Sequence, residues 1–348
     1  MTLETTRHTT GISEGAPTDP ALPGLSLLSR PAELMGLLSS LLTHWLGANR
    51  LILDCRVKLR RYVPGKRCIL ALELSVESKE SGGVECRKLI GKVYGNDQGK
   101  KAYDTLRELR DHGFADGRLT VTEPLAYDPR WQLLLLDHSQ GELLRNLILA
   151  QSDLGGALEG AAEWLAKVHG CKATGGRHYA FQDHLGTLRV RQQALDQASP
   201  NAALSFWAVL ARLESRLNNI TEQLLPGPTH YDFSPDHLLV DENRFTGLDF
   251  DEFRQYDPLF DVAHFMAHIG YLGLLHSGSP HRFNALAERF LAAYHRCARN
   301  QSLGRLELYL ALAYLKLAQI VALVTRPANW QEMTDTLLAE AQQFSQEK

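Results

Sequence analysis

The pattern of hydrophobic and polar positions changes partway along this chain of 348 residues. Up to residue 137, apolar residues gather in short runs separated by turn-forming residues, which is typical of β-strands. Helical periodicity interrupts these runs at 32–46 and at 97–112. The strands that this pattern predicts lie at 51–62, 67–76, 84–94, 119–126 and 132–137.

Beyond residue 137, the composition and the spacing of apolar positions favour helices. The predicted helices lie at 142–150, 153–171, 202–224, 258–273, 281–297, 305–324 and 329–344. We therefore expect an α+β protein with a small β-rich lobe at 25–137 and a helical lobe at 138–348. Residues 1–24 are rich in Thr, Gly and Pro and are expected to form a flexible tail.

Composition adds few constraints. The net charge of −3 gives no electrostatic reason to expect nucleic acid or an anionic membrane as a partner. The five cysteines are scattered and never occur in C-x-x-C spacing, which favours reduced thiols in a cytoplasmic protein. The longest apolar segment, 306–324, contains Glu307, Lys316 and Gln319. Those polar residues favour a buried helix over a membrane span.

The segment 229–253 combines titratable residues with the pattern of a β-hairpin. The apolar runs LLV and FTGL flank the turn-forming residues Asp-Glu-Asn. His237 and Asp249 are equally far from Asn243, so a hairpin centred on that residue places them nearly opposite each other. Cross-strand neighbours lie about 4.5–5.5 Å apart, which suits two ligands of one metal ion.

A loop with a second acid precedes this hairpin. Asp232 lies two residues after His230, in a loop that contains Pro235 and from which a side chain can project. An acid in a loop, followed by a metal pair on a hairpin, indicates phosphoryl transfer, because that chemistry needs a positioned hydroxyl and cations on the phosphates.

The order of these motifs resembles a known group of enzymes. His230, Asp232 and His237 form H-x-D-x-x-x-x-H, which is followed by L-D-F at 248–250 and D-P-x-x-D at 257–261. This string is similar to that of the aminoglycoside phosphotransferases and choline kinases, which are small-molecule relatives of the protein kinases.

The resemblance implies a protein-kinase-like fold with two lobes and a nucleotide cleft between them. The small N-lobe would cover the nucleotide, and the C-lobe would carry a catalytic loop at 229–237 and a metal hairpin at 238–251. ATP, or another nucleoside triphosphate, is the implied phosphate donor. A small molecule with a hydroxyl group is the implied acceptor.

The same resemblance suggests roles in the helical lobe. Asp232 would orient the attacking hydroxyl and accept its proton, and Asp249 would coordinate Mg²⁺. His237 stands where the group has Asn; because imidazole is a poorer ligand for Mg²⁺ than an amide oxygen, Mn²⁺ is also expected as a cofactor. It could instead hydrogen-bond Asp232 without touching metal. Asp251, expected on the same strand face as Asp249, would be an auxiliary metal ligand or a substrate contact.

Two further residues are expected to support this loop. His230 would brace the catalytic loop through hydrogen bonds. Asp261 would connect the following helix to the same loop. Neither residue is expected to take part in the chemistry.

The β-rich lobe is expected to bind the nucleotide. Lys92, in L-I-G-K-V-Y, resembles the strand lysine of kinases that contacts the α- and β-phosphates. Strand alternation puts Ile90 on the same face, where it could cover the adenine. No G-x-G-x-x-G loop is present, and the kinase helix glutamate that pairs with the strand lysine has no clear equivalent, since Ala102 aligns with it.

Two other segments are weaker candidates for nucleotide contacts. The turn at 63–67 replaces the glycine-rich loop, and its Lys66 and Arg67 are expected to contact phosphate. The hinge from Leu136 to His138 is expected to offer backbone groups to the adenine.

Three functions fit these observations. An ATP-dependent phosphotransferase acting on a small hydroxyl compound fits them best. A nucleotide-binding relative without activity is the alternative, because of His237 and the two missing N-lobe features. A metal-dependent phosphohydrolase fits less well, because Asp236 and His237 stand in the reverse order before a strand. The sequence leaves the acceptor and the oligomeric state open.

Overall fold

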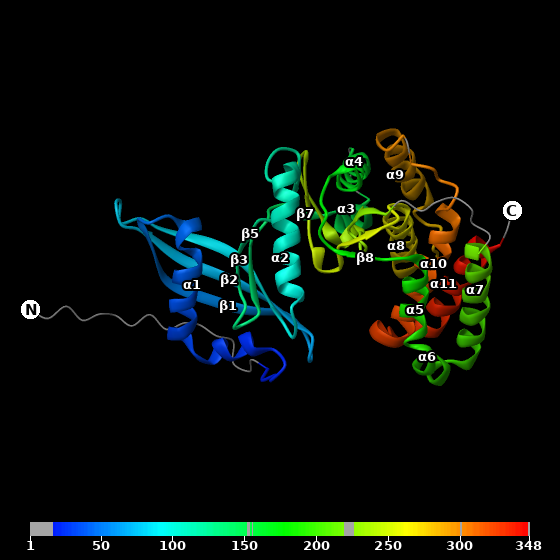
Figure 1. Cartoon of the computed structure of the whole chain (residues 1–348), viewed down its shortest axis with the longest axis horizontal. Coiled ribbons are helices and arrows are strands. Elements are labelled where there is room, and N and C mark those ends of the chain that lie inside the picture. Colours follow the sequence, from blue (N-terminus) through cyan, green and yellow to red (C-terminus); the bar gives the residue numbers. More distant parts are fainter. Residues whose placement is uncertain (1–16, 152–153, 155, 219–225, 300, 347–348) are drawn as a thin grey trace, which may run out of the picture. The chain divides into compact units, whose positions relative to one another are not determined.

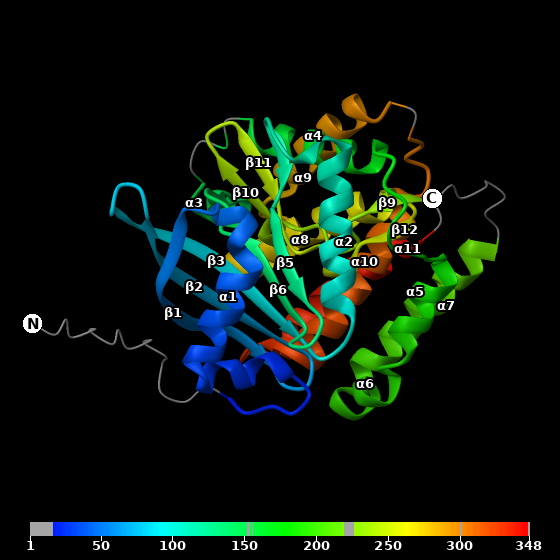
Figure 2. The same ribbon diagram turned by 60° about the vertical axis from the view of Figure 1, so that its left-hand side comes forward.

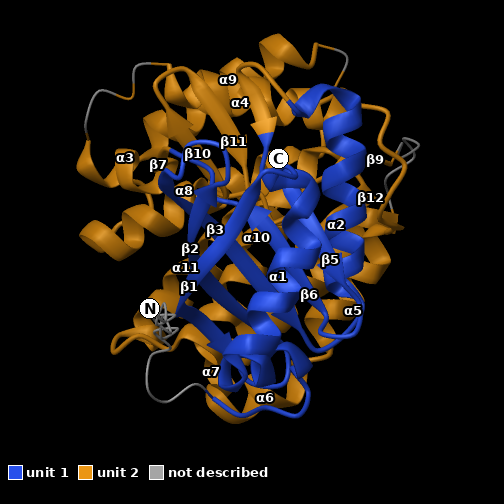
Figure 3. Ribbon diagram, turned by 90° about the vertical axis from the view of Figure 1, so that its left-hand side faces the viewer, with its two compact units in different colours: residues 1–115, 121–140 blue, residues 116–120, 141–348 orange. Residues whose placement is uncertain are grey.

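The computed structural model describes residues 17–151, 154, 156–218, 226–299 and 301–346 (Figure 1). The chain divides into two compact units, one of residues 1–115 and 121–140 and the other of residues 116–120 and 141–348 (Figure 3). The sequence places the boundary after residue 137, close to the division at 140. It does not anticipate that residues 116–120 join the second unit.

The first unit contains a five-stranded antiparallel sheet in the order β1-β2-β3-β6-β5. Its strands are β1 (Arg50–Val63), β2 (Arg67–Ser78), β3 (Val84–Tyr94), β6 (Leu133–Asp137) and β5 (Pro124–Asp128). Its helices are the 3-10 helix η1 (Pro23–Ser29), α1 (Pro31–Leu46), α2 (Gln98–Leu109) and the π-helical turn Arg110–Phe114.

Helix α1 packs on one face of this sheet, as Figure 2 shows. Leu34, Leu38 and Leu42 are buried along it, three to four residues apart, because that spacing brings side chains to one side of a helix. They meet the strand residues Leu89 and Val93, among others, in one apolar core. Alternation along β3 therefore places Ile90 and Lys92 on the opposite face of the sheet.

The described part of the expected tail is ordered against this unit. Leu22 is fully buried, and the Asp19 carboxylate accepts hydrogen bonds from Tyr62 Oη at 3.0 Å and from the Gly65 amide at 2.7 Å. The prediction of a flexible tail to residue 24 is therefore wrong for residues 17–24. Residues 1–16 lie outside the described part of the chain.

The second unit contains two small sheets, in the orders β4-β11-β10-β7 and β8-β12-β9. Their strands are β4 (Leu119–Val121), β7 (Glu142–Leu143), β8 (Arg177–His178), β9 (Gly227–Thr229), β10 (Leu238–Asp241), β11 (Arg244–Gly247) and β12 (Arg254–Tyr256). Two 3-10 helices, Pro235–His237 and Phe250–Glu252, lie on either side of the β10–β11 hairpin in sequence.

Helices make up most of this unit. They are α3 (Leu144–Ala150), α4 (Ala157–Gly170), α5 (Phe181–Arg189), α6 (Gln192–Ala198), α7 (Pro200–Asn218), α8 (Leu259–Ser277), α9 (Asn284–Cys297), α10 (Leu306–Ile320), the π-helical turn Val321–Thr325 and α11 (Trp330–Ser345). Helices α8 and α10 pack directly against each other (Figures 1 and 2).

The sequence pattern misses several elements. The single strand expected at 119–126 is two strands, of which β4 pairs with β11 of the second unit. Helices α5 and α6 were not predicted, and the helix expected at 142–150 begins with the two strand residues of β7. Helix α7 is described only to Asn218, so the predicted end at 224 lies outside the described residues, as does the predicted start at 153.

The β10–β11 hairpin packs against α4 through two glycines. A Cβ atom added at Gly247 would overlap the Trp164 ring, and one added at Gly160 would overlap the Phe245 ring. Trp164 is also fixed by its Nε1, which donates a hydrogen bond to the Thr120 carbonyl at 2.8 Å. Only residues without a side chain allow the hairpin and the helix to approach this closely.

One helical stretch in the described residues, Leu306–Thr325, is long and apolar enough to cross a membrane. Most of it is buried within the protein, as the core helix of a folded unit would be.

Candidate active site

The loop between β9 and β10 is held by a buried carboxylate at the start of α8. Asp261 is fully buried, and its two oxygens accept hydrogen bonds from the backbone amides of His230 and Tyr231, each at 2.7 Å. His169 on α4 lies 3.1 Å from the same carboxylate. A carboxylate that accepts several N–H bonds fixes the backbone that supplies them, so the start of the loop is held in place.

His230 lies between this loop and the hairpin. Its Nε2–H donates to the Leu248 carbonyl at 2.8 Å, and the ring is fully buried. Burial, helped by the nearby His237, lowers the pKa of His230, so the ring is neutral. His230 therefore connects the loop to the end of the hairpin and has no exposed atom for chemistry.

Asp232 follows a residue with strained backbone. Tyr231 has φ 66°, in the left-handed region that non-glycine residues rarely adopt. Such strain persists only where the surroundings enforce it and often marks a functional site. Here the Asp261 bonds enforce it, and the chain turns so that the Asp232 side chain remains 38% exposed.

The two oxygens of Asp232 have different surroundings. Oδ1 accepts a hydrogen bond from Lys316 Nζ at 3.0 Å. No described residue donates a hydrogen bond to Oδ2. Burial raises the pKa of Asp232. The Lys316 ammonium and the neighbouring imidazoles lower it by more than burial raises it, so the pKa lies well below the ordinary value. Asp232 is thus an ionised carboxylate with one oxygen held and the other open.

The lysine beside Asp232 is itself held. Lys316 Nζ lies 3.1 Å from His264 Nε2, and His264 Nδ1 lies 3.0 Å from the Phe233 carbonyl. The carbonyl can only accept, so Nδ1 carries the proton and Nε2 accepts from the ammonium. Burial and the Lys316 charge keep the pKa of His264 well below its usual value, consistent with a neutral ring.

Sequence analysis does not identify Lys316 or His264 as site residues. In the sequence, Lys316 is only a polar residue that argues against a membrane span. A charge within an otherwise apolar, buried helix must be paired or solvated, and this signal could have directed attention to it. The partner, however, lies 84 residues away in sequence and only the fold reveals it.

His237 and Asp249 come close together at the base of the hairpin. His237 Nε2 lies 3.9 Å from Asp249 Oδ2. The predicted centre at Asn243 is wrong by half a residue: the register is Leu238 with Gly247, and the Leu248 amide donates to the His237 carbonyl at 2.9 Å, so His237 lies opposite Leu248 and next to Asp249. The hairpin is therefore centred between residues 242 and 243, because the turn has two residues.

The ring of His237 is oriented as a metal ligand would be. Its Nδ1 lies 2.7 Å from the Asp232 carbonyl and donates to it, which leaves the lone pair on Nε2. Ligating histidines usually donate their second N–H in this way. Two ligands at about 2.0–2.2 Å from one ion lie no more than about 4.4 Å apart, so the separation of 3.9 Å allows a shared ion.

The described residues contain no group of three or more His, Cys, Asp or Glu side chains placed to hold a metal ion. Two protein ligands would leave most of the coordination sphere to other groups. That is the usual arrangement for Mg²⁺ with substrate phosphates.

Asp251 is not on a strand. It lies in the 3-10 helix Phe250–Glu252, which begins after Asp249, and Asp249 itself has φ 59° in the left-handed region. The predicted alternation between Asp249 and Asp251 on one strand face is therefore wrong, because β11 ends at Gly247.

The candidate nucleotide residues lie in the first unit. Lys92 is 6% exposed and lies near the end of β3, where it pairs with Leu134 of β6, and Ile90 pairs with Leu136. A buried lysine is uncommon, because its charge must be compensated. The Asp137 amide donates to the Glu123 carbonyl, and the His138 amide donates to the Asp137 carboxylate.

The turn between β1 and β2 is less favourable than expected. Lys66 is exposed and Arg67 is half-buried. The Gly65 amide of this turn donates to Asp19. Any phosphate contact at this turn would have to come from the side chains.

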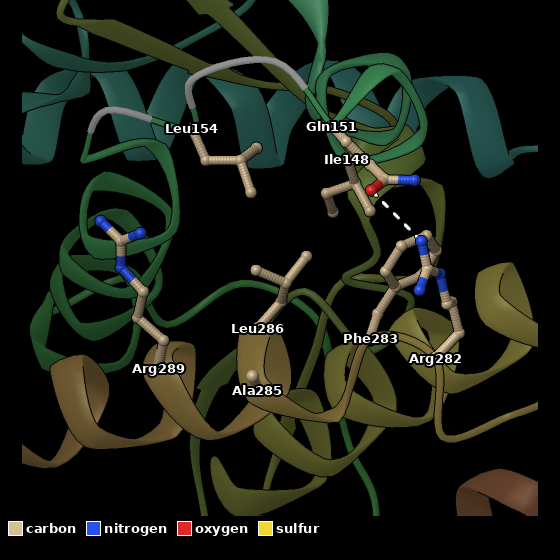
Figure 4. Close-up of a pocket in the computed structure, with 8 residues that line it drawn as sticks. All are labelled: Ile148, Gln151, Leu154, Arg282, Phe283, Ala285, Leu286 and Arg289. Carbon is tan, nitrogen blue, oxygen red and sulfur yellow. Dashed lines mark hydrogen bonds between the residues drawn. The ribbon is translucent and has the colours of Figure 1, made fainter.

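A separate hollow of about 360 Å³ lies in the second unit, where the chain after α3 meets the start of α9 (Figure 4). Its lining residues are Ile148, Gln151, Leu154, Arg282, Phe283, Ala285, Leu286 and Arg289. Arg282 donates to Gln151 Oε1 at 3.3 Å, and Arg289 pairs with Glu159 at 2.6 Å. None of the residues that the sequence predicts for the site lines this hollow.

Comparisons with known proteins agree with this architecture. A small sheet unit followed by a larger helical unit, with a loop carboxylate and a hairpin after it, is the protein-kinase-like fold of small-molecule phosphotransferases. Residues 87–309 match the Phosphotransferase enzyme family, and the chain belongs to that family. Family membership supports small-molecule phosphotransferase activity. No curated protein matches the chain in sequence.

Solved structures with the same fold are distant in sequence. Spectinomycin phosphotransferase, solved with ADP and spectinomycin, has a TM-score of 0.59 and 12% identity, over 90% of this chain and 97% of that one. Choline kinase from Cryptosporidium parvum has a TM-score of 0.59 and 10% identity, over 90% of this chain and 94% of that one. A choline/ethanolamine kinase family protein from Mesorhizobium loti has a TM-score of 0.55 and 16% identity, over 79% of this chain and 85% of that one.

Proposed function

We propose that this protein is a phosphotransferase that moves the γ-phosphate of ATP, or of another nucleoside triphosphate, to a hydroxyl group of a small molecule. The observation that carries the proposal is the state of Asp232. Its carboxylate is held ionised by Lys316 through one oxygen, and the other oxygen accepts no hydrogen bond from the described residues. An acceptor hydroxyl can donate to that open oxygen.

Asp232 would act by orientation more than by base strength. A carboxylate with a depressed pKa is a weak base, and a loose phosphoryl-transfer transition state needs little proton abstraction. The acceptor oxygen would form its bond to the γ-phosphorus as the bond to the bridging oxygen of the nucleoside diphosphate breaks. The hydroxyl proton would pass to Asp232 Oδ2 and then to solvent.

His237 and Asp249 would hold a divalent cation, Mg²⁺ or Mn²⁺, which supplies positive charge to the nucleotide phosphates when bound. The donor set fits this role, since one imidazole nitrogen and one carboxylate face each other at 3.9 Å. The Asp249 side chain is half-buried, and its backbone is left-handed. Asp251 is the candidate for an additional ligand.

The first unit would contribute the nucleotide contacts. Lys92 is the candidate for the α- and β-phosphates, with Lys66 and Arg67 as further phosphate contacts. Ile90 and the hinge at 136–138 are the candidates for contacts with the base.

Metal-dependent consumption of nucleoside triphosphate tests the proposal. Asp232→Asn should abolish turnover while the protein still binds nucleotide, and Asp335→Asn, at an exposed position of α11, should retain it. Binding without metal-dependent turnover in the wild-type protein would instead favour an inactive relative, which His237 and Ala102 make the second candidate. Hydrolysis of simple phosphate esters without nucleotide would favour a phosphohydrolase.

A further inference from the structure

We propose that Lys316 determines acceptor specificity: it excludes alcohols that carry a positive charge beside the reacting hydroxyl and favours those that carry a carboxylate or a phosphate. This inference rests on the proposed phosphotransferase function, because it concerns the acceptor of that reaction. It is carried by the surroundings of Asp232 within the second unit.

Lys316 is fixed at the place that an acceptor must approach. Its Nζ atom contacts Asp232 Oδ1 at 3.0 Å and His264 Nε2 at 3.1 Å, and its side chain is 21% exposed. His264 is fully buried and is itself held by the Phe233 carbonyl. If the ammonium moved away from Asp232, the Asp232 Oδ1 atom and the buried His264 Nε2 atom would both lose their hydrogen-bond donor.

Asp232 is the sole carboxylate that pairs with Lys316 among the described residues. The other groups that act most strongly on Asp232 are imidazoles. Burial, together with the Lys316 charge, keeps His264 neutral, and burial lowers the pKa of His268 to about 3. A cationic acceptor that donates to Asp232 would thus approach a carboxylate that already pairs with an ammonium, and Lys316 would repel it.

Three aromatic rings around the Asp232 loop already contact cations of the protein itself. Lys316 Nζ lies 5.5 Å from the ring centre of Tyr231 and 5.7 Å from that of Phe260. The guanidinium of Arg254 lies 4.5 Å from the Tyr231 ring and 4.4 Å from that of Tyr179. Aromatic faces bind ammonium groups through their negative face, and the protein's own cations already occupy this interaction.

An anionic acceptor meets the opposite situation. A hydroxyl that donates to Asp232 Oδ2 lies within a few ångströms of the ammonium on Oδ1, so a carboxylate or phosphate on an adjacent carbon can reach Lys316. At such distances a single charge in a partly buried site changes affinity by roughly tenfold or more. Lys316 would therefore select acceptors by their charge, whereas Asp232 would bind their hydroxyl group.

The test compares small alcohols that differ in charge. Glycerate and glycerol phosphate represent anionic acceptors, glycerol represents neutral ones, and choline and ethanolamine represent cationic ones. The rate of metal-dependent ATP consumption above the acceptor-free rate is measured for each class at several concentrations. Wild-type protein is compared with Lys316→Met, which removes the charge at similar length, and with Lys316→Arg, which keeps it. Lys172→Met, at an exposed position, serves as the control.

We expect wild-type protein and the Lys172→Met and Lys316→Arg variants to use the anionic alcohols with kcat/KM at least tenfold above the cationic ones. Lys316→Met should lose this discrimination. Preference for a cationic alcohol, an unchanged charge preference in Lys316→Met, or no difference among the classes in wild-type protein would each overturn the inference. Failure of the proposed function would give a different result. The wild-type protein would then show no metal-dependent nucleotide turnover, or turnover that persists in Asp232→Asn.

Discussion

The ammonium of Lys316 lies 3.0 Å from Asp232 Oδ1, although 84 residues separate the two in sequence. Helix α10 carries the lysine, and the loop after β9 carries the aspartate. The contact connects the candidate reacting carboxylate to the helical core of the second unit. It also sets the charge state of that carboxylate, because burial alone would favour the protonated form.

Loss of this cation should make activity sensitive to acid. In the wild-type protein the pKa of Asp232 is depressed, so the carboxylate stays ionised even as the pH falls towards the pKa that an Asp side chain has in the unfolded chain. In Lys316→Met the raising effect of burial loses the largest contribution that opposes it, and the pKa of Asp232 should rise. The kcat/KM of the variant should then fall several-fold at moderately acidic pH, where the wild-type value persists.

The measurement is the pH profile of kcat/KM with a neutral acceptor, so that acceptor charge does not contribute. Lys316→Arg retains a cation and should keep the wild-type acid limb. Identical acid limbs in wild-type protein and Lys316→Met would show that Lys316 does not control the ionisation of Asp232.

The sequence is informative about this site only where the relevant contacts are local. Strands β1 to β3 and the long helices follow from periodicity, because apolar spacing is a property of each segment alone. The loop acid Asp232 and the hairpin pair follow from spacing within 25 residues. The role of Lys316 depends on the packing of α10 beside α8, which no local pattern contains.

Two errors within the hairpin have a similar origin. The register of β10 and β11 is set by a two-residue turn at residues 242 and 243, so the hairpin is centred half a residue before Asn243. The sequence shows turn-forming residues there but does not give the length of the turn. The sequence predicts Asp251 on a strand because Asp249 and Asp251 alternate with Phe250, whereas β11 ends at Gly247 and the backbone at Asp249 is left-handed. Strand β4 was merged with β5 because its partner, β11, is distant in sequence.

The identity of residue 237 should determine the metal preference. His237→Asn replaces an imidazole nitrogen by an amide oxygen, which Mg²⁺ prefers, whereas Mn²⁺ tolerates both. We expect the ratio of activity with Mg²⁺ to activity with Mn²⁺ to increase by roughly tenfold, equivalent to about 1.4 kcal/mol. Initial rates across a titration of each metal measure this ratio.

His295→Asn, at an exposed position of α9, is the matched control and should leave the ratio unchanged. Equal metal profiles in wild-type protein and His237→Asn would remove His237 from the metal site. The hydrogen bond from its Nδ1 to the Asp232 carbonyl would then be its only assigned role.

Asp261 should matter for stability as well as for activity. Asp261→Asn leaves one carbonyl oxygen for the two loop amides that the carboxylate now serves at 2.7 Å each. One buried N–H then faces an NH₂ group, so we expect a loss of about 3 kcal/mol in the free energy of unfolding. The loop should also lose its fixed backbone, and turnover should fall with it.

Urea denaturation followed by intrinsic fluorescence, together with nucleotide turnover on the same samples, measures both effects. Asp335→Asn, which changes an exposed carboxylate on α11, should alter neither by a measurable amount. Wild-type stability in Asp261→Asn would contradict the assignment of Asp261 as the residue that holds the loop.

The close contact between the hairpin and α4 yields a final prediction. A methyl group at Gly247 would overlap the ring of Trp164, which is fully buried and hydrogen-bonded to Thr120. Gly247→Ala should therefore shift the hairpin away from α4 and cost about 1–3 kcal/mol, the usual range for overpacking a core. Gly186→Ala is the matched control, because a methyl group there meets no atom within 4 Å and the residue lies in helix α5. That control should be neutral or stabilising by up to about 1 kcal/mol, since Ala is the better helix former.

Thermal unfolding of the two variants gives the comparison. Metal-dependent turnover of Gly247→Ala then shows whether the position of the hairpin affects His237 and Asp249. These two residues flank the hairpin in sequence and lie together at its base. A displaced hairpin should therefore lower activity by more than the loss of folded protein explains. Equal stability and activity in both variants would mean that the hairpin tolerates the methyl group by local adjustment and that α4 does not set the positions of His237 and Asp249.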